Sequence, residues 1–220
     1  MKSNGIERIT GKKRPLIGVI GAAKPTGEYS REVGRLAGYK LRKYLEGNEG
    51  TIFTGGVNGV GFDVYAGIVR FHLETYLKDD RLLEDMFFVL TPESEAVPKE
   101  YIDLSRIVAR LEIVRVGADL EQRRTCLAEV ADVLIVLNGA YGTLDEAVKG
   151  LKNSKRVVTL PSTGGTADLL AAIKEGSLDR VKIEELKELD LYPEGCDLDL
   201  ITISSDPDDM IRKLSGLDLV

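Results

Sequence analysis

The chain is poor in the side chains that build most metal sites and nucleophilic sites. It has one histidine, His72, and two cysteines, Cys126 and Cys196, which lie far apart and lack the spacing of a zinc knuckle. His72 lies in a segment whose pattern is helical, where a packing or surface role is the commoner one. The sequence therefore disfavours metal coordination and a histidine-based triad, and we expect no metal ion and no cofactor.

Other absences concern the location of the protein. No stretch of the sequence is apolar for long enough to cross a bilayer, and the N-terminal residues do not resemble a secretory signal. Two widely separated cysteines suit a reducing compartment. We therefore expect a cytoplasmic protein that has no membrane partner.

The composition suits one large domain. The 220 residues are 43% hydrophobic and contain no linker-like tract, so the chain can bury a substantial core. The formal net charge of −6 at pH 7 does not favour broad attraction to nucleic acid or to an anionic surface. We expect a single domain over residues 1–220, with a flexible lead over 1–14, that holds any anionic ligand locally.

Hydrophobic periodicity predicts strands that alternate with helices. Short aliphatic runs predict the strands, and apolar residues at helical spacing predict the helices between them. The expected strands lie at 15–20, 51–53, 86–90, 111–116, 133–137, 156–160 and 198–203, and the expected helices lie at 28–45, 61–77, 119–130, 143–152, 167–175 and from 206 onward. This alternation predicts an α/β fold, Rossmann-like, with a doubly wound and mostly parallel sheet covered by helices on both faces.

Four of the loops that follow strands are rich in small residues. They lie at 21–24, 54–59, 138–142 and 162–166, and strand-to-helix loops of a parallel sheet all emerge at its carboxyl edge. Unpaired backbone N–H groups at the start of a helix attract anions. Each loop alone is explained equally well by steric relief at a tight turn, but four such loops on one edge predict a phosphate-binding rim.

Arg123 is the most informative charged residue. It lies three residues after Leu120 and four before Leu127, so its side chain projects with the apolar stripe of its helix. A buried arginine needs a partner. That partner is either an acidic side chain or the phosphate or developing charge of a ligand. The neighbouring Arg124 lies just off the stripe, where a surface role is favoured.

Glu146 has two competing interpretations. The segment Thr143-Leu144-Asp145-Glu146 matches a capping box, in which the glutamate returns a hydrogen bond to the start of the helix. The Glu146 side chain also lies opposite the buried stripe of its helix, so it could point into the rim as a base or as a stabiliser of positive charge. Spacing alone favours the cap.

Other polar residues in these loops also have two interpretations each. Lys24 could reach a phosphate or stay solvated, and Asp63 could bind a ribose hydroxyl, although a helix cap is favoured for it. The hydroxyl of Thr143 could bond an amide or a phosphate oxygen. Tyr141 could stack on a base, although an exposed loop tyrosine needs no such explanation.

Taken together, these residues resemble the Lonely Guy family, long described as possible lysine decarboxylases, within a wider superfamily of Rossmann-like nucleotide binders that includes molybdenum cofactor carriers. The family has a small-residue turn after its first strand, a GGxxG loop after its second, an Arg-Lys pair ahead of a Ser-Asp, and a PGGxGTxxE motif. The resemblance runs from about Leu16 to Leu170, and the counterparts are Gly21-Ala22-Ala23, 54–59, Arg123-Arg124, Ala131-Asp132 and 138–146.

The resemblance implies a dimer or higher homo-oligomer that cleaves the N-glycosidic bond of a nucleoside 5′-monophosphate, releasing base and ribose 5-phosphate. It implies Arg123 and Glu146 as the catalytic pair, which places the functional role of Glu146 above the cap. A carboxylate suits this reaction because cleavage builds positive charge on the ribose. The resemblance assigns phosphate binding to Gly139, Gly142 and Thr143. With the loop residues considered above, the full set expected to contact phosphate or ligand is Gly21, Ala22, Lys24, Gly55, Gly56, Gly59, Arg124, Gly139, Ala140, Tyr141, Gly142 and Thr143.

The chain departs from the family pattern at the motif loop. Asn138 stands where the motif has proline, and Ala140 stands where it has glycine, which adds a methyl group and restricts positive φ. The loop at 59–63 also lacks the usual Leu-Met-Gly. Hydrolysis stays the leading hypothesis, and the substitutions at Asn138 and Ala140 motivate an alternative, a non-catalytic carrier or sensor of a phosphorylated ligand. Lysine decarboxylation fits poorly, because no lysine is placed for a pyridoxal phosphate Schiff base.

Overall fold

The computed structural model describes residues 4–76, 87–108 and 111–217. The described strands form one seven-stranded sheet in which every neighbouring pair is parallel. They are β1 (Leu16–Gly21), β2 (Thr51–Thr54), β3 (Phe87–Thr91), β4 (Glu112–Arg115), β5 (Val133–Leu137), β6 (Arg156–Leu160) and β7 (Ile201–Ile203). The α/β, Rossmann-like class predicted from the periodicity is confirmed.

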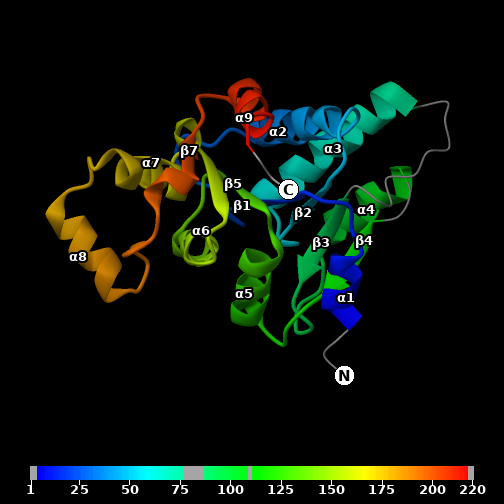
Figure 1. The fold of residues 1–220 in the computed structure, drawn as a ribbon. Helices are drawn as coiled ribbons and strands as arrows, with labels where there is room; N and C mark the ends of the chain where they lie inside the picture. Colours follow the sequence, from blue (N-terminus) through cyan, green and yellow to red (C-terminus); the bar gives the residue numbers. More distant parts are fainter. Residues whose placement is uncertain (1–3, 77–86, 109–110, 218–220) are drawn as a thin grey trace.

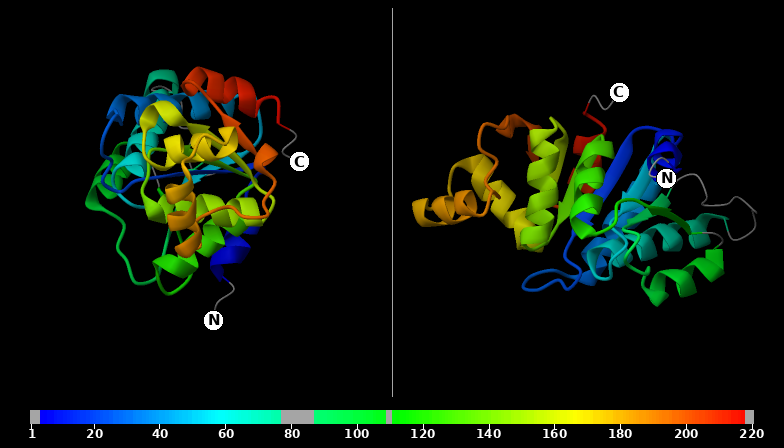
Figure 2. Two further views of the ribbon diagram at one scale, coloured as in Figure 1. Left: turned by 90° about the vertical axis from the view of Figure 1, so that its left-hand side faces the viewer. Right: turned by 90° about the horizontal axis from the view of Figure 1, so that it is seen from below.

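Helices cover both faces of the sheet (Figures 1 and 2). The described α-helices are α1 (Asn4–Thr10), α2 (Arg31–Tyr44), α3 (Val60–Tyr76), α4 (Lys99–Val108), α5 (Leu120–Val130), α6 (Tyr141–Lys152), α7 (Thr166–Glu175), α8 (Arg180–Glu188) and α9 (Pro207–Leu214). Short 3-10 turns lie at Pro161–Thr163 and Leu198–Leu200. None of the helices that the structure describes is long and apolar enough to cross a membrane.

The strand order is β4-β3-β2-β1-β5-β6-β7, so the chain winds outward from β1 in one direction and from β5 in the other. The register pairs Gly21 with Leu137, which brings the carboxyl ends of β1 and β5 level with each other. In open α/β sheets, ligands bind in the crevice where the winding direction reverses. The topology therefore singles out the loops after β1 and β5.

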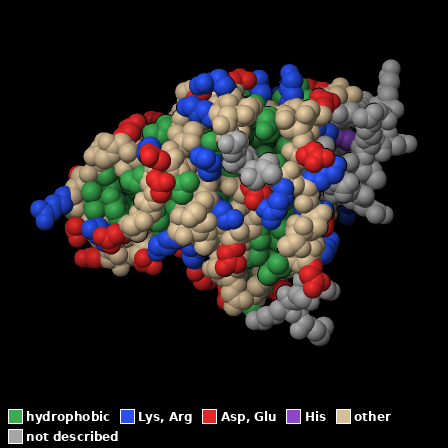
Figure 3. Space-filling model, in the orientation of Figure 1, with side chains coloured by type: hydrophobic (Ala, Val, Ile, Leu, Met, Phe, Trp, Pro, Cys, Tyr) green, Lys and Arg blue, Asp and Glu red, His purple; other side chains and the backbone are tan. Residues whose placement is uncertain are grey.

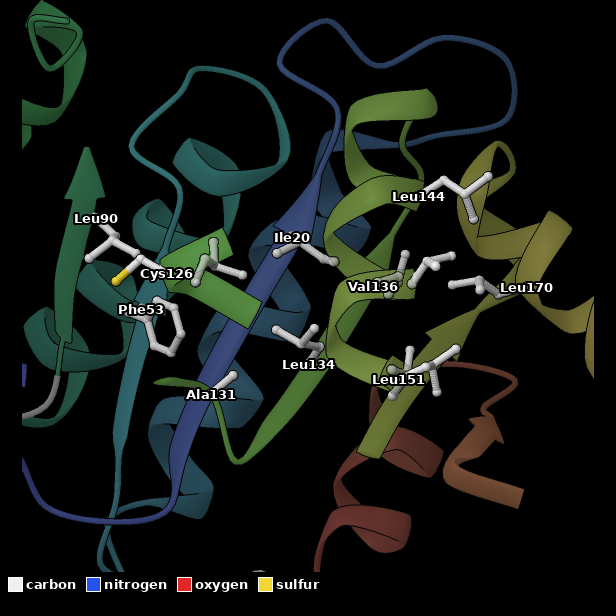
Figure 4. Packing of buried hydrophobic residues seen from close by; sticks show 14 of the residues in the cluster. Ile20, Phe53, Leu90, Cys126, Ala131, Leu134, Val136, Leu144, Leu151 and Leu170 are labelled. Atoms are coloured by element: carbon white, nitrogen blue, oxygen red, sulfur yellow. The ribbon is translucent and has the colours of Figure 1, made fainter. Parts of the chain in front are cut away.

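The core consists of two layers, one on each face of the sheet. Alternate residues of a strand point to opposite faces, so Ile17 and Val19 pack with α2, α3 and α9, whereas Ile20 packs with α5, α6 and α7. Figure 4 shows the second layer, in which Val136, Leu144 and other aliphatic side chains fill the space between the sheet and these helices. The long apolar runs in the sequence are thus strands buried on both faces.

The N-terminal lead, expected to be flexible over 1–14, is instead helical over Asn4–Thr10. This helix packs on β4, where Ile9 is only 1% exposed. Arg8 and Lys12 both pair with Glu112. The lead at 1–14 is short and basic, and it has too few apolar positions to show a helical period. The contacts with β4, which is distant in the sequence, hold its helix in place.

Three further segments differ from the sequence-based expectation. The segment at 99–108 forms α4, and the charged segment near 181–191 forms α8, which has Asp179 as N-cap and Leu186 as its buried residue. The last expected strand is shorter than predicted. Its first residues form a 3-10 turn, in which Asp197 accepts a hydrogen bond from the amide of Asp199, and β7 begins at Ile201.

Candidate functional site

The loops after β1, β2, β5 and β6 meet at the carboxyl edge of the sheet. The side-chain amide of Asn138, after β5, donates to the carbonyl of Thr26, in the β1 loop, at 3.2 Å. The amide of Thr166, after β6, donates to the carbonyl of Gly139 at 3.0 Å. The amide of Val60, after β2, donates to the carbonyl of Ala22 at 3.1 Å. Direct contacts thus join the four loops into one rim.

Asn138 fixes the shape of the β5 loop. Its φ is +55°, a conformation that proline cannot adopt. Its amide donates to Thr163 Oγ1 at 2.6 Å, and its side chain donates to the Thr163 carbonyl at 2.7 Å. With asparagine in place of the motif proline, the β5 loop therefore has a backbone conformation that the proline would not allow, and hydrogen bonds hold it to the β6 loop.

The two small residues after Asn138 differ in whether their backbone conformation allows a side chain. Gly139 has φ +118°, and a Cβ on it would lie 2.6 Å from the Cβ of Thr143, so only glycine fits. Ala140 is extended, with φ −121°. The alanine at the position of the motif glycine is therefore unstrained, because the backbone there needs no positive φ.

The start of α6 presents a run of unused backbone donors. Ala140 is the N-cap, and no side chain caps the helix. Within the described residues, the N–H groups of Gly139, Ala140, Tyr141 and Gly142 donate no hydrogen bond. Ala140 and Tyr141 are exposed. Four consecutive amides without acceptors at the positive end of a helix dipole favour an anion as their partner.

Arg124 lies beside this run of amides. A Cβ built on Gly142 would be 2.7 Å from Nη2 of Arg124. Its side chain is 29% exposed and its ion pair with Glu121 is long, at 3.8 Å. Arg124 was expected to be a surface residue by spacing alone and a ligand contact by family resemblance. The structure places it beside the first turn of α6, and its role as a ligand contact stays a prediction.

Arg123 and Glu146 form a buried ion pair beneath the rim. Nη1 of Arg123, on α5, lies 2.6 Å from Oε1 of Glu146, on α6, and each residue is 5% exposed. The arginine also presses against the β2 loop, because a Cβ on Gly55 would lie 2.6 Å from its Nη1. Within the described residues, Nε of Arg123 has no hydrogen-bond partner. The pair joins three of the elements that form the site.

The structure contradicts the capping role that spacing alone favoured for Glu146. The helix begins at Tyr141 with Ala140 as N-cap, so Thr143 lies inside the first turn and cannot act as N-cap. Burial raises the pKa of the Glu146 carboxyl, and the charges of Arg123 and Arg124 oppose this shift. A carboxylate desolvated in this way is a stronger electrostatic partner for a cation than an exposed one.

The remaining predicted contacts are spread along the rim. Gly21 ends β1, where a Cβ would meet the carbonyl oxygen of Leu137 at 2.3 Å, and Gly56 and Gly59 adopt positive φ in the β2 loop. Lys24 is exposed. These glycines let the loops approach one another closely, whereas Lys24 is available to solvent or to a ligand.

Sequence reasoning missed the contribution of α8. Lys182 Nζ lies 3.1 Å from the hydroxyl of Tyr141, and that hydroxyl donates to Glu185. Lys182 also contacts Glu185 at 2.9 Å. No local pattern links residues 41 positions apart, and the charged segment was not assigned to a helix, so its proximity to the site could not be predicted.

Asp63 lies at a second part of the rim, between the loop after β1 and the first turn of α3. It was expected to cap α3, but the helix begins at Val60 and the carboxylate is occupied elsewhere. Tyr29 donates to Oδ2 of Asp63 at 3.1 Å, and Nε of Arg31 lies 3.2 Å from Oδ1. Burial raises the pKa of Asp63 and of Tyr29, and the charge of Arg31 lowers both.

Neither histidine nor cysteine contributes to the rim. His72 is buried in α3, Cys126 is buried in α5, and both cysteines are unpaired thiols. Burial raises the pKa of Cys126 to about 11, which leaves it an unreactive thiol. In the part of the chain that the structure describes, no three His, Cys, Asp or Glu side chains are grouped to hold a metal ion.

Comparisons with known proteins place the fold in a wider group. No family model matches the chain. An uncharacterized protein of Archaeoglobus fulgidus is 26% identical over 145 residues, which cover 66% of this chain and 78% of that protein. The solved structure of TM1055 aligns with 93% of this chain and 100% of its own, at a TM-score of 0.64 and 19% identity.

Two further solved structures have named functions. The molybdenum cofactor binding protein of Rippkaea orientalis aligns with 92% of this chain and 96% of its own, at a TM-score of 0.56 and 19% identity. DNA processing protein A of Helicobacter pylori, which binds single-stranded DNA, aligns with 95% of this chain and 83% of its own, at a TM-score of 0.56 and 15% identity. At these identities the likeness establishes a shared Rossmann-like fold, whose members bind different ligands.

Proposed function

We propose that the protein binds a small phosphorylated ligand, such as a nucleotide, with its phosphoryl group on the amides of 139–142. The observation that carries this proposal is the run of four unused N–H groups at the start of α6. Arg124 adds a positive charge beside them, and the site lies where the sheet reverses its winding direction. The fold shared with a protein that binds the molybdenum cofactor is consistent with a carrier or sensor.

Hydrolysis of a nucleoside 5′-monophosphate is a second candidate function, and the buried Arg123–Glu146 pair favours it. A carboxylate held 2.6 Å from a guanidinium beneath the phosphate site could stabilise the positive charge that develops on the ribose and orient a water. The arginine would then hold Glu146 in place or assist the departure of the base. A resemblance to the Lonely Guy family supports the same pair of roles.

One experiment separates the two candidates. The protein is incubated with AMP, GMP, CMP, IMP and ribose 5-phosphate, binding is measured by calorimetry, and free base is measured by chromatography. Saturable binding without base release supports the carrier. Base release that is lost in Glu146→Gln supports hydrolysis, and Glu129→Gln, at an exposed position of α5, is the matched control. If none of these compounds binds, the proposal is wrong.

A further inference from the structure

A pocket of about 330 Å³ lies at the rim between the loop after β1 and α3. This volume is at the lower end of the range typical of small-molecule sites. Its walls combine two aromatic residues and a proline with charged and polar groups, and the residues are Ala23, Pro25, Tyr29, Arg31, Asn58, Gly59, Phe62, Asp63 and Glu100. The proposed phosphate site at α6 leaves this pocket unexplained.

Asp63 is the unusual member of the pocket lining. Its side chain is 0% exposed, and its Oδ1 has no hydrogen-bond partner among the described residues. Arg31 lies within ion-pairing distance of this oxygen, but its Nε is not aligned for a hydrogen bond. A buried carboxylate oxygen without a donor is costly, so its persistence calls for an explanation.

Arg31 is a removable cover for this carboxylate. Arg31 lines the pocket as the first residue of α2, directly after the N-cap Ser30, and its side chain is 66% exposed. Tyr29 is less mobile, because its hydroxyl donates to Oδ2 and its ring packs against the core. A ligand that supplies N–H donors could therefore displace the guanidinium from Oδ1 without disturbing Tyr29.

We propose that this pocket binds the heterocyclic ring of the ligand, and that Asp63 selects rings with adjacent N–H donors on one edge, as in the 2-amino-4-oxopyrimidine edge of guanine and pterins. A carboxylate has acceptor sites for about four hydrogen bonds, so Oδ1 and Oδ2 can accept two parallel N–H bonds from such an edge while Oδ2 keeps its bond from Tyr29. Phe62 supplies an apolar wall for a flat ring, and its own ring is held edge-on against Tyr101, at 5.3 Å between centroids. A sugar diol would gain less from these apolar walls.

This inference rests on the proposed function, because the ring and the phosphoryl group belong to one ligand. The loop after β1 connects the two sites. Ala23, Pro25 and Tyr29 line the pocket, and Thr26, in the same loop, accepts a hydrogen bond from Asn138 at the start of the phosphate-binding segment. Both sites therefore lie on the same edge of the sheet.

The test is a calorimetric comparison of GMP, IMP, AMP and ribose 5-phosphate with the full chain. IMP lacks the 2-amino group of GMP, so the account predicts that it binds about tenfold or more weakly, the ratio expected for one lost hydrogen bond to a charged group. AMP lacks the N–H donor at N1 and is expected to bind more weakly still. Asp63→Asn should abolish these preferences while leaving the affinity for ribose 5-phosphate unchanged.

Arg31→Gln is the second variant, chosen because an exposed position tolerates substitution. It removes the competing cation, so it should keep the preference for GMP over IMP and bind GMP at least as tightly as the unsubstituted protein. Equal affinity for GMP, IMP and AMP, or a preference that survives Asp63→Asn, would overturn this inference and leave the proposed phosphate site unaffected. Failure of ribose 5-phosphate and of every nucleotide to bind would overturn the proposed function instead.

Discussion

At the scale of the residue, Asn138 decides the shape of the candidate site. Its positive φ and three hydrogen bonds to neighbouring loops fix the direction in which the following amides point. The family motif has proline at this position, so the sequence alone suggests that the asparagine weakens the motif. In this chain the asparagine is instead a local anchor, which the residue type alone could not reveal.

Restoring the motif residue should therefore destabilise the protein. Asn138→Pro forces φ from +55° to about −65° and removes a buried N–H donor, so we expect a loss of about 3 kcal/mol or more in the free energy of unfolding. Asn138→Gly tolerates the backbone and loses only side-chain bonds, at a cost of about 1–2 kcal/mol. Urea denaturation measures both. Equal losses would contradict the role assigned to φ.

The Arg123–Glu146 pair makes a second residue-scale prediction. Glu146→Leu leaves a cation that is 5% exposed without its anion, which typically costs about 3–5 kcal/mol. The double variant Arg123→Met with Glu146→Leu removes both charges, and we expect it to be more stable than either single variant. A double-mutant cycle measured by denaturation tests this. Additive losses would show that the two side chains do not interact.

Asp63 makes a pH prediction. Because burial raises the pKa of Asp63, its carboxyl becomes protonated at a higher pH than an ordinary aspartate and then loses an acceptor site. The ratio of GMP affinity to AMP affinity should therefore fall as the pH drops through this raised pKa, and it should be constant above it. The ratio is the readout because the phosphate groups of both nucleotides titrate alike. A ratio that rises with acidification contradicts the assignment.

At the scale of the element, the start of α6 carries the proposed binding. Gly139→Ala introduces strain at φ +118° and a clash with Thr143, so it should displace the amides and weaken the binding of ribose 5-phosphate about tenfold or more. Gly176→Ala, at the end of α7, has φ +66° and open space around it. This control should cost about 1–3 kcal/mol of stability and leave the binding unchanged.

Some elements of the fold could be predicted from the sequence, and some contacts between them could not. Long aliphatic runs and glycine-rich turns predicted β1, β5 and the loop at 138–142, because a parallel strand must be apolar on both faces and its loops must turn tightly. The apolar stripe of α5 correctly predicted that Arg123 is buried. The family resemblance, not the periodicity, named Glu146 together with Arg123. The roles of Tyr29 and Lys182 depend on contacts between distant segments, which periodicity does not encode.

At the scale of the whole molecule, the winding order explains why one edge of the sheet carries the candidate site. β1 and β5 are adjacent although the 111 residues 22–132 lie between the end of β1 at Gly21 and the start of β5 at Val133. The loops that follow them lead to helices on opposite faces of the sheet, the arrangement in which ligands bind in open α/β sheets. Figure 3 shows a surface on which positive and negative side chains are mixed. This mixture agrees with recognition of an anion by a local site.

The assembly of the whole molecule is a separate prediction. By resemblance to the Lonely Guy family we expect a homodimer or a higher homo-oligomer. Light scattering coupled to size-exclusion chromatography should give at least twice the mass of the 24.1 kDa chain. A monomer mass across the accessible concentration range would remove this expectation without affecting the phosphate site.

The most direct measurement of the central claim is a titration with ribose 5-phosphate followed by amide NMR. The account predicts that the N–H signals of Gly139, Ala140, Tyr141 and Gly142 move most and move together, because their protons acquire a phosphate acceptor. The signal of Gly176 should not move. Saturable binding whose shifts fall elsewhere, with these four signals unchanged, would contradict the account.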